Sequence, residues 1–342
     1  MKRIAVLTGG GDVPGLNAAI RAVVRRATER GLDVLGVRDG WRGLLVDDTV
    51  PLARAEISGI LPRGGTILGT SRTNPLAAED GPRRARATMA ARGIDGLVAI
   101  GGDDTLGAAA RLSREGLAVV GVPKTMDNDV HGTDACIGFD TAVNTVMEAL
   151  DRLHPTAEAH HRVIVVEVMG RDAGWVATVG GLAGGADVVL VPEVPYEVEE
   201  VCARLERRRA AGRAFAIVVV AEGAAPRGAA GQVVQEAEVD EYGHARLGGI
   251  GAALAREIQR RTEWETRAVA LGHVQRGGAP TAFDRVLATR LGAAAVDELA
   301  AGRAGVMVAL RGAAIVAVPL DEVQRGPRTV DPELYALTRT FW

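Results

Sequence analysis

The chain has 342 residues, 47% of them hydrophobic, and a formal net charge of −3. This length suits two α/β lobes that share a cleft and is long for a single hydrophobic core, while the hydrophobic content excludes a disordered chain. The small net charge gives no sign of nucleic-acid binding, and no apolar run reaches the roughly 18 residues that would predict a membrane span.

The N-terminus and the cysteines indicate the compartment. The first residues, MKRIAVLTGGGD, read as a short strand followed by a turn, and not as a signal peptide. The two cysteines, Cys136 and Cys202, lie far apart and form no metal or redox motif. We therefore expect a reduced, cytoplasmic protein.

Short runs rich in β-branched residues alternate along the chain with longer segments of helical period. This alternation predicts an α/β fold with mainly parallel sheets, helices on both faces, and ligands at the carboxyl ends of the strands. The predicted strands are Arg3–Thr8, Asp33–Val37, Gly96–Ile100, Ala118–Val122, Val163–Val168, Val188–Val191, Phe215–Ala221, Arg267–Leu271 and Val306–Leu310. The predicted helices are Asn17–Ala27, Arg83–Ala91, Thr105–Arg114, Thr141–Leu153, Val198–Ala211, Gly248–Arg261 and Arg285–Ala300.

Glycines gather at the ends of the predicted strands, although 44 glycines could also reflect a biased composition. Residues 224–246 differ, because they are rich in Gly, Ala and acidic residues and have no clear period. They predict a surface excursion.

The first glycine turn, Thr8-Gly-Gly-Gly-Asp12, lies between a predicted strand and a predicted helix. Backbone N–H groups of such a turn can approach an anion at the helix N-terminus, although a simple tight turn would read the same way. The chain contains no Gly-Lys pair and this turn is not GxGxxG, so neither a Walker A loop nor a dinucleotide fingerprint is present here.

Two further strand ends carry carboxylates. Asp103 and Asp104 follow a glycine pair and suggest a Mg²⁺ site, with helix capping as the alternative. The segment Pro123–Asp129 holds a lysine, a threonine and two aspartates within seven residues. Phosphoryl transfer to an alcohol needs a base beside the hydroxyl and positive charge beside the phosphates. A turn with Asx hydrogen bonds would explain the Asn and Asp of this segment but not its lysine.

Lysine usage adds weight to that segment. The chain has 40 Lys and Arg residues, of which only Lys2 and Lys124 are lysine. A lysine in this loop is therefore unlike the usual cation of this chain.

Arginines stand where later strands begin and, beside further glycine turns, where they end. They suit a second phosphate because the guanidinium fork matches phosphate oxygens. Taken singly, each could be a surface ion-pair residue, and His273 could be a structural histidine. The residues concerned are Arg162, Arg171, Arg267 and Arg276.

Taken together and in this order, these segments resemble the phosphofructokinase family. The resemblance runs through LTGGGDVPGLNAAIR, GGDDT, PKTMDND, VVEVMGR, AEG and LGHVQRGG, and it covers almost the whole chain. It implies two Rossmann-like lobes with the active site in the cleft between them. It also implies a donor lobe of residues 1–138 plus about 277–325, a fructose 6-phosphate lobe of residues 139–276, and a C-terminal segment of about 326–342 that packs back.

The resemblance also assigns roles to single residues. Asp127 matches the base that takes the proton from the 1-hydroxyl of fructose 6-phosphate, and Asp103 matches the acid at the Mg²⁺ ion. Gly10, Gly11 and Arg72 match the donor-binding residues. Residues that match the sugar-phosphate site are Thr125, Asp129, Met169, Gly170, Arg171, Glu222, His273 and Arg276, with Arg171 also counted as catalytic. Arg162 and Arg267 match arginines that reach into a neighbouring subunit, so the resemblance implies a homodimer or homotetramer.

The donor implied is pyrophosphate. Members that use ATP typically carry glycine where this chain has Asp104 and Lys124, and members that use pyrophosphate carry Asp and Lys. An Asp104 carboxylate in the place of a nucleotide α-phosphate would exclude ATP by bulk and charge, since two like charges at about 4 Å repel by roughly 4 kcal/mol at an effective dielectric of 20. Lys124 would supply the positive charge that the shorter donor lacks, as a compact ammonium.

Some residues depart from the family pattern, and three alternative functions were considered. Arg21, Arg25 and Arg54 match basic residues of the family's effector site, but His154 stands where allosteric members have arginine, which implies weak allosteric control. The rivals are an ATP-dependent phosphofructokinase, a non-catalytic sugar-phosphate sensor and a dinucleotide-dependent oxidoreductase. The sensor should have lost Asp127 or Asp103, and the oxidoreductase should carry GxGxxG with an acidic residue about 20 positions later.

Overall fold

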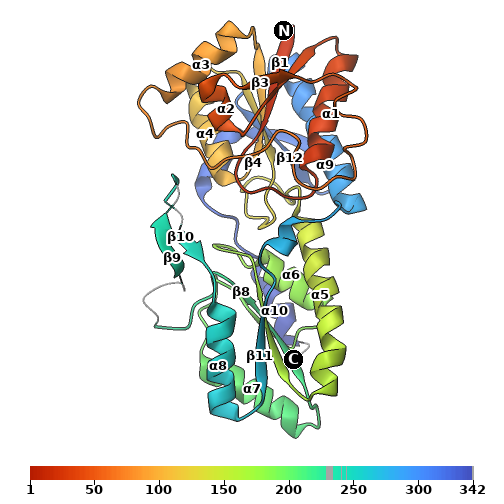
Figure 1. Ribbon diagram of the computed structural model, residues 1–342, viewed down its shortest axis with the longest axis vertical. Coiled ribbons are helices and arrows are strands. Elements are labelled where there is room, and N and C mark those ends of the chain that lie inside the picture. Colours follow the sequence, from red (N-terminus) through yellow and green to blue (C-terminus); the bar gives the residue numbers. More distant parts are fainter. Residues whose placement is uncertain (229–233, 240, 244, 341–342) are drawn as a thin grey trace.

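Two β-sheets, each covered by helices, form two lobes that follow one another along the long axis of the molecule (Figure 1). The computed structural model describes the backbone of residues 1–228, 234–239, 241–243 and 245–340. The predicted fold class, α/β with mainly parallel sheets, is confirmed. Within the described residues no helix is long and apolar enough to cross a membrane.

The first lobe contains a seven-stranded sheet in the order β13-β12-β5-β4-β1-β2-β3. Its five central strands are parallel, and an antiparallel strand lies at each edge. The strands are β1 (Arg3–Thr8), β2 (Asp33–Val37), β3 (Thr49–Pro51), β4 (Gly96–Gly101), β5 (Val119–Pro123), β12 (Val306–Arg311) and β13 (Ala314–Pro319).

Alternate residues of the central strands enter two different cores, as a period of two requires. Ile4 and Val6 of β1 belong to the core that includes α1 (Leu16–Glu29) and α9 (Ala282–Ala300). Ala5 and Leu7 belong to the core on the other face. That second face is covered by α2 (Trp41–Val46), α3 (Gly81–Ala91) and α4 (Asp103–Arg114).

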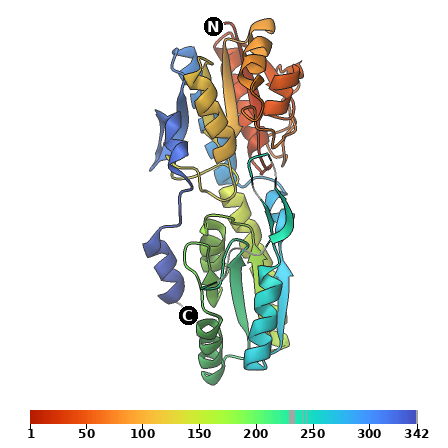
Figure 2. The ribbon, with the colours of Figure 1, turned by 90° about the vertical axis from the view of Figure 1, so that its left-hand side faces the viewer.

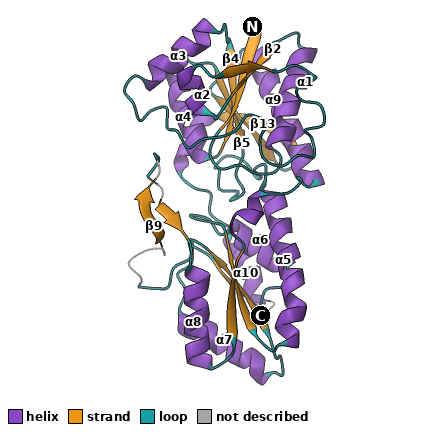
Figure 3. Cartoon of the chain, viewed as in Figure 1, coloured by secondary structure: helices purple, strands orange, loops and turns teal. Residues whose placement is uncertain are grey.

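The second lobe contains a four-stranded parallel sheet in the order β11-β6-β8-β7. The runs of valine in these strands are typical of a sheet that is buried on both faces. The strands are β6 (Val163–Val168), β7 (Val188–Leu190), β8 (Ala216–Ala221) and β11 (Thr266–Ala270). The helices are α5 (Phe139–Ala159), α6 (Trp175–Ala183), α7 (Val198–Ala210), α8 (Ile250–Thr262) and α10 (Pro332–Thr340), as the view by element type also shows (Figure 3).

A buried carboxylate joins the lobes where the chain passes from one to the other. Asp284, near the start of α9, accepts hydrogen bonds at 2.8 Å from the backbone N–H of Gly138 and of Thr141, at the start of α5. The hydroxyl of Thr141 also donates to Asp284, at 2.5 Å. Because Asp284 has no exposed surface, these bonds satisfy a group that would otherwise be costly to bury. They fix how the first helix of the second lobe leaves the first lobe.

Residues 224–246 were predicted to form a surface excursion, and no strand was predicted within them. The segment contains a two-stranded antiparallel hairpin, β9 (Val234–Val239) and β10 (Ala245–Leu247). The hairpin rises from the second lobe along the side of the molecule towards the first (Figures 1 and 2). The helices α2, α6 and α10 and the strands β3 and β13 were also not predicted, whereas every predicted strand and helix is present to within a few residues.

Candidate active site

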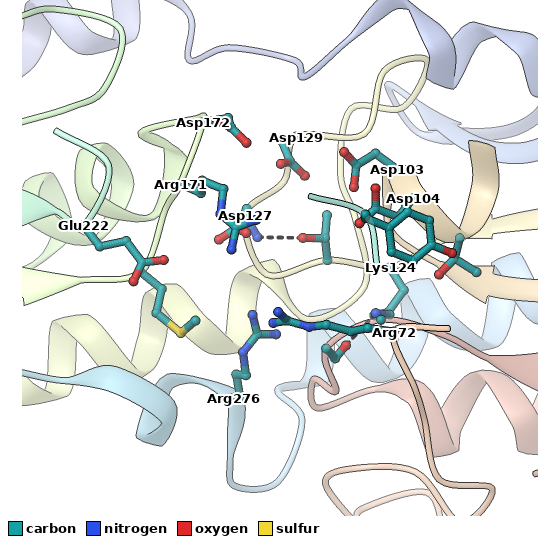
Figure 4. A pocket seen from close by; sticks show the side chains of 17 residues that line it. Arg72, Asp103, Asp104, Lys124, Asp127, Asp129, Arg171, Asp172, Glu222 and Arg276 are labelled. Atoms are coloured by element: carbon teal, nitrogen blue, oxygen red, sulfur yellow. Dashed lines mark hydrogen bonds between the residues drawn. The ribbon is translucent and has the colours of Figure 1, made fainter. Parts of the chain in front are cut away.

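A cavity lies between the lobes, at the carboxyl ends of β1, β4 and β5 and of β6 and β8 (Figure 4). This is where an open α/β sheet is expected to bind its ligand. Its lining combines a glycine turn, one lysine, several arginines and a group of carboxylates. The lining residues are Gly10, Gly11, Arg72, Gly102, Asp103, Asp104, Thr105, Lys124, Thr125, Asp127, Asp129, Met169, Arg171, Asp172, Glu222, Tyr242 and Arg276.

The glycine turn after β1 is closely packed by neighbouring side chains. Gly10 has a φ of +76°, a conformation that glycine adopts without strain. A Cβ on Gly9 would lie 2.6 Å from Oγ1 of Thr105, and a Cβ on Gly11 would collide with the guanidinium of Arg276. The turn is therefore packed between two lining residues, with its backbone facing the cavity.

Lys124 is almost completely buried behind this turn, with 2% of its surface exposed. Its Nζ donates to the carbonyl oxygens of Gly9, at 2.9 Å, and of Gly11, at 2.6 Å. Burial, with repulsion from Arg276, lowers the pKa of Lys124 to about 7. The lysine thus holds the two ends of the glycine turn and brings its charge to the floor of the cavity, where an anion would favour the protonated form.

The lowered pKa of Lys124 predicts a specific pH dependence of stability. Lys124 titrates near 7 in the folded protein and near its ordinary value of 10.5 in the unfolded chain. Between these values the unfolded chain binds the extra proton, so stability rises with pH. We expect wild-type protein to gain about 1.4 kcal/mol per pH unit relative to Lys124→Met between about pH 7.5 and 9.5. Urea denaturation of both proteins measures this, and parallel pH profiles would contradict it.

The segment after β5 carries the remaining central residues. The side chain of Asn128, which has a φ of +54°, accepts a hydrogen bond from the backbone N–H of Cys136 at 2.8 Å and so turns the loop back on itself. The backbone N–H of Asp127 donates to Oγ1 of Thr125 at 3.1 Å, the bond drawn in Figure 4. The Oδ1 of Asp127 is buried and has no hydrogen-bond partner within the described part of the chain. A buried, unpaired carboxylate oxygen in a cavity is suited to accept a proton from a ligand.

The carboxylates of the cavity repel one another. Burial raises the pKa of Asp127, against the opposing effect of Arg276 and Arg171. The pKa of Asp129 lies well above its ordinary range because of burial and the charges of Asp127 and Asp103. Burial, with Asp127, raises the pKa of Glu222 to about 7.

This concentration of negative charge fits a divalent cation. The described residues contain no group of three or more His, Cys, Asp or Glu side chains arranged around one metal position. Mg²⁺ does not need one, because it prefers one or two carboxylates together with phosphate oxygens and water. Asp103 at the start of α4, beside Asp104, faces the same cavity and could contribute one such carboxylate (Figure 4).

Most of the predicted site residues line this one cavity, but four do not. Gly170, with a φ of +139°, accepts a hydrogen bond from the backbone N–H of Gly223 at 3.0 Å. His273 lies exposed in the short 3₁₀ helix Gly272–Arg276. Arg162 immediately precedes β6, and Arg267 lies on the neighbouring strand β11. Both pair with Glu265, at N–O distances of 2.9 Å and 2.6 Å respectively.

Four lining residues were not predicted, namely Gly102, Thr105, Asp172 and Tyr242. Gly102 and Thr105 are neighbours of predicted residues, and Asp172 follows Arg171, so position after a strand could have indicated them. Tyr242 carried no such signal, because it lies in the segment of residues 224–246 that has no clear period.

An interlobe cavity with a glycine turn, an acidic cluster and several arginines is typical of a phosphoryl-transfer enzyme of the α/β class. The sequence model of the family described as phosphofructokinase matches residues 3–299, and the chain belongs to this family.

Individual relatives agree with this assignment. The chain is 57% identical to the pyrophosphate–fructose 6-phosphate 1-phosphotransferase of Streptomyces coelicolor, over 99% of both chains. It is 52% identical to the ATP-dependent 6-phosphofructokinase 3 of the same organism, over 98% of both chains. Among solved structures, phosphofructokinase from Saccharomyces cerevisiae matches with a TM-score of 0.83 and 33% identity, over 95% of this chain and 45% of that one.

Proposed function

We propose that this protein reversibly transfers a phosphoryl group from pyrophosphate to the 1-hydroxyl of fructose 6-phosphate, giving fructose 1,6-bisphosphate and phosphate. The observation that supports the proposal most strongly is the buried Oδ1 of Asp127, which has no hydrogen-bond partner among the described residues. The same cavity contains the glycine turn whose carbonyl oxygens accept hydrogen bonds from Lys124. The relative named as a pyrophosphate-dependent phosphotransferase is also more similar than the relative named as ATP-dependent.

Asp127 is the proposed base. Burial raises its pKa, which makes its carboxylate a stronger base than an ordinary aspartate. Arg171 and Arg276, which oppose that rise, keep positive charge close to the position where the transferred group must pass. Mg²⁺, held by Asp103 and the donor oxygens, would supply charge neutralisation for the phosphates.

The donor side consists of Gly10, Gly11 and Arg72, with Asp104 and Lys124 as the residues that select the donor. Lys124 stands behind the glycine turn, so its charge acts on the phosphate nearest the turn. Asp104 on α4 restricts the same side of the cavity by its negative charge and its bulk.

The sugar-phosphate side is the second lobe. Residues proposed to hold fructose 6-phosphate are Thr125, Asp129, Met169, Gly170, Arg171, Glu222, His273 and Arg276. We also propose that the chain divides by ligand. Residues 1–138 and about 277–325 form the donor lobe, and residues 139–276 form the fructose 6-phosphate lobe. A C-terminal segment of about 326–342 packs back.

Arg162 and Arg267 are proposed to complete the site of a neighbouring subunit in a homodimer or homotetramer. Support comes from their position, because neither lines the cavity of its own chain and both are held at one carboxylate, Glu265. The active site would then bind the 6-phosphate only in the oligomer.

This arrangement predicts complementation between inactive variants. Mixing Arg162→Ala with Asp127→Ser protein should restore part of the activity, because hybrid oligomers contain sites with an intact base and an intact arginine. Subunit exchange should be verified with differently tagged chains. If exchange occurs and activity stays at the level of the separate variants, each site is complete within one chain.

The function itself is tested with purified protein, fructose 6-phosphate, pyrophosphate and Mg²⁺. We expect formation of fructose 1,6-bisphosphate and one phosphate per turnover, and loss of the reaction when Mg²⁺ is chelated. ATP dependence is the second candidate, favoured by the ATP-dependent relative, and the same assay with ATP distinguishes the two.

A further inference from the structure

The hairpin of residues 234–247 connects the lobes beside the cavity. It leaves the second lobe after β8 and returns to α8 of the same lobe, so the whole segment belongs to the sugar-phosphate side. Its residues Glu241 and Tyr242 nevertheless contact the first lobe, immediately after Arg72. Figures 1 and 2 show the hairpin alongside the gap between the two sheets.

Two hydrogen bonds make this contact. The Oη of Tyr242 donates to the carbonyl oxygen of Thr73, at 3.1 Å. The backbone N–H of Asn74 donates to Oε2 of Glu241, at 2.8 Å. We name these four residues the interlobe clasp. Tyr242 also lines the cavity, so the clasp lies at the edge of the site itself.

The residues on both sides of Arg72 in the chain are therefore held by hydrogen bonds. On its N-terminal side, the hydroxyl of Thr70 donates to the carbonyl of Gly10 at 2.6 Å, and the N–H of Gly10 donates to the carbonyl of Ser71 at 3.0 Å. On its C-terminal side, Thr73 is held by Tyr242 of the clasp. The contacts on the N-terminal side thus involve the glycine turn after β1, and the contact on the C-terminal side involves the second lobe.

These hydrogen bonds matter because the side chain of Arg72 is long and exposed, and it extends into the cavity beside Arg276 (Figure 4). A cation stabilises a transferring phosphoryl group only when it is held in place before the reaction, since ordering a flexible arginine costs conformational entropy. Fixing the backbone on both sides removes the backbone part of that cost and sets the point from which the side chain extends.

We propose that Glu241 and Tyr242 are positioning residues for phosphoryl transfer, which hold Arg72 in its catalytic place and make that place depend on the approach of the two lobes. The proposal rests on the donor-side role proposed above for Arg72. It concerns turnover more than stability, because the hydrogen bonds of Glu241 and Tyr242 to Asn74 and Thr73 lie at exposed or partly exposed positions.

The test compares a double variant of the clasp in the wild-type background with the same double variant in the Arg72→Ala background. Each hydrogen bond of ordinary strength corresponds to roughly a 2- to 10-fold effect. The double variant Glu241→Ala, Tyr242→Phe should lower kcat with pyrophosphate about tenfold and leave the KM for fructose 6-phosphate within about twofold. In the Arg72→Ala background the same changes should cause no further loss. Glu241→Gln should behave as wild type, because its amide oxygen can accept the same bond.

The outcomes separate the clasp from the role of Arg72. A strong loss in Arg72→Ala with no loss in the double variant overturns the clasp alone. An equal loss in the presence and absence of Arg72 also overturns it, since the hairpin would then act by another route. Full turnover in Arg72→Ala contradicts the proposed role of Arg72 and the clasp with it.

Discussion

Replacing Asp127 with serine should lower turnover by about 10²–10⁴-fold while both substrates still bind. Asp127 brings the one buried carboxylate oxygen without a partner, among those that the structure describes, into a cavity that faces both lobes. Serine cannot take the proton of the acceptor hydroxyl at neutral pH, and the arginines beside Asp127 would still attract the phosphates. Steady-state kinetics and a separate binding measurement for fructose 6-phosphate test both parts of this expectation.

The matched control is Asp151→Ser, which makes the same chemical change at an exposed position of α5 outside the cavity. It should keep wild-type kinetics. If Asp127→Ser retains more than half of the wild-type turnover, Asp127 is not the base.

The second large effect concerns the donor. Lys124→Gly should lower turnover with pyrophosphate by roughly 10²–10³-fold, since it removes a charge-assisted contact close to the phosphates. It also removes the hydrogen bonds that hold the carbonyls of Gly9 and Gly11. Asp104→Gly should increase the rate with ATP relative to pyrophosphate, because it removes bulk and a repulsive charge. The two effects need not add, since both residues line one cavity.

Two conservative variants identify the cause. Asp104→Asn keeps the bulk and removes the charge, so a gain with ATP in this variant would assign the selectivity to charge. Lys124→Arg keeps the charge but cannot fit the narrow space below the glycine turn, and we expect it to remain impaired. Wild-type turnover in Lys124→Gly would contradict the proposed role of the lysine.

The site could be predicted well from the sequence wherever a residue follows a strand. In a parallel sheet the carboxyl ends of the strands share one edge, so Gly10, Asp103 and Lys124 were expected at that edge, and they lie close together because β4 pairs with both β1 and β5. The same reasoning brought Arg171 and Glu222 together at the ends of β6 and β8. The family resemblance then gave each of them a role.

What could not be predicted depends on tertiary contacts. The hydrogen bonds from Lys124 to Gly9 and Gly11 join residues more than a hundred positions apart. Residues 224–246 have no clear period from which a strand could be predicted, and Tyr242 is a single aromatic residue among polar ones. The helix α6 contains two glycines, which disfavour helix, but Gly180 lies so close to Val146 that a Cβ there would be 2.7 Å from its side chain. Close packing has overridden propensity in that helix.

The choice of donor is the most direct test of the proposed function. Initial rates of the purified wild-type protein should be measured with fructose 6-phosphate, Mg²⁺ and either pyrophosphate or ATP, and in the reverse direction with fructose 1,6-bisphosphate and either phosphate or ADP. We expect kcat/KM for pyrophosphate to exceed that for ATP by more than about a hundredfold, as a repulsion of roughly 4 kcal/mol at Asp104 requires, and the reverse reaction to proceed with phosphate. Turnover with ATP and none with pyrophosphate would contradict the roles of both Asp104 and Lys124.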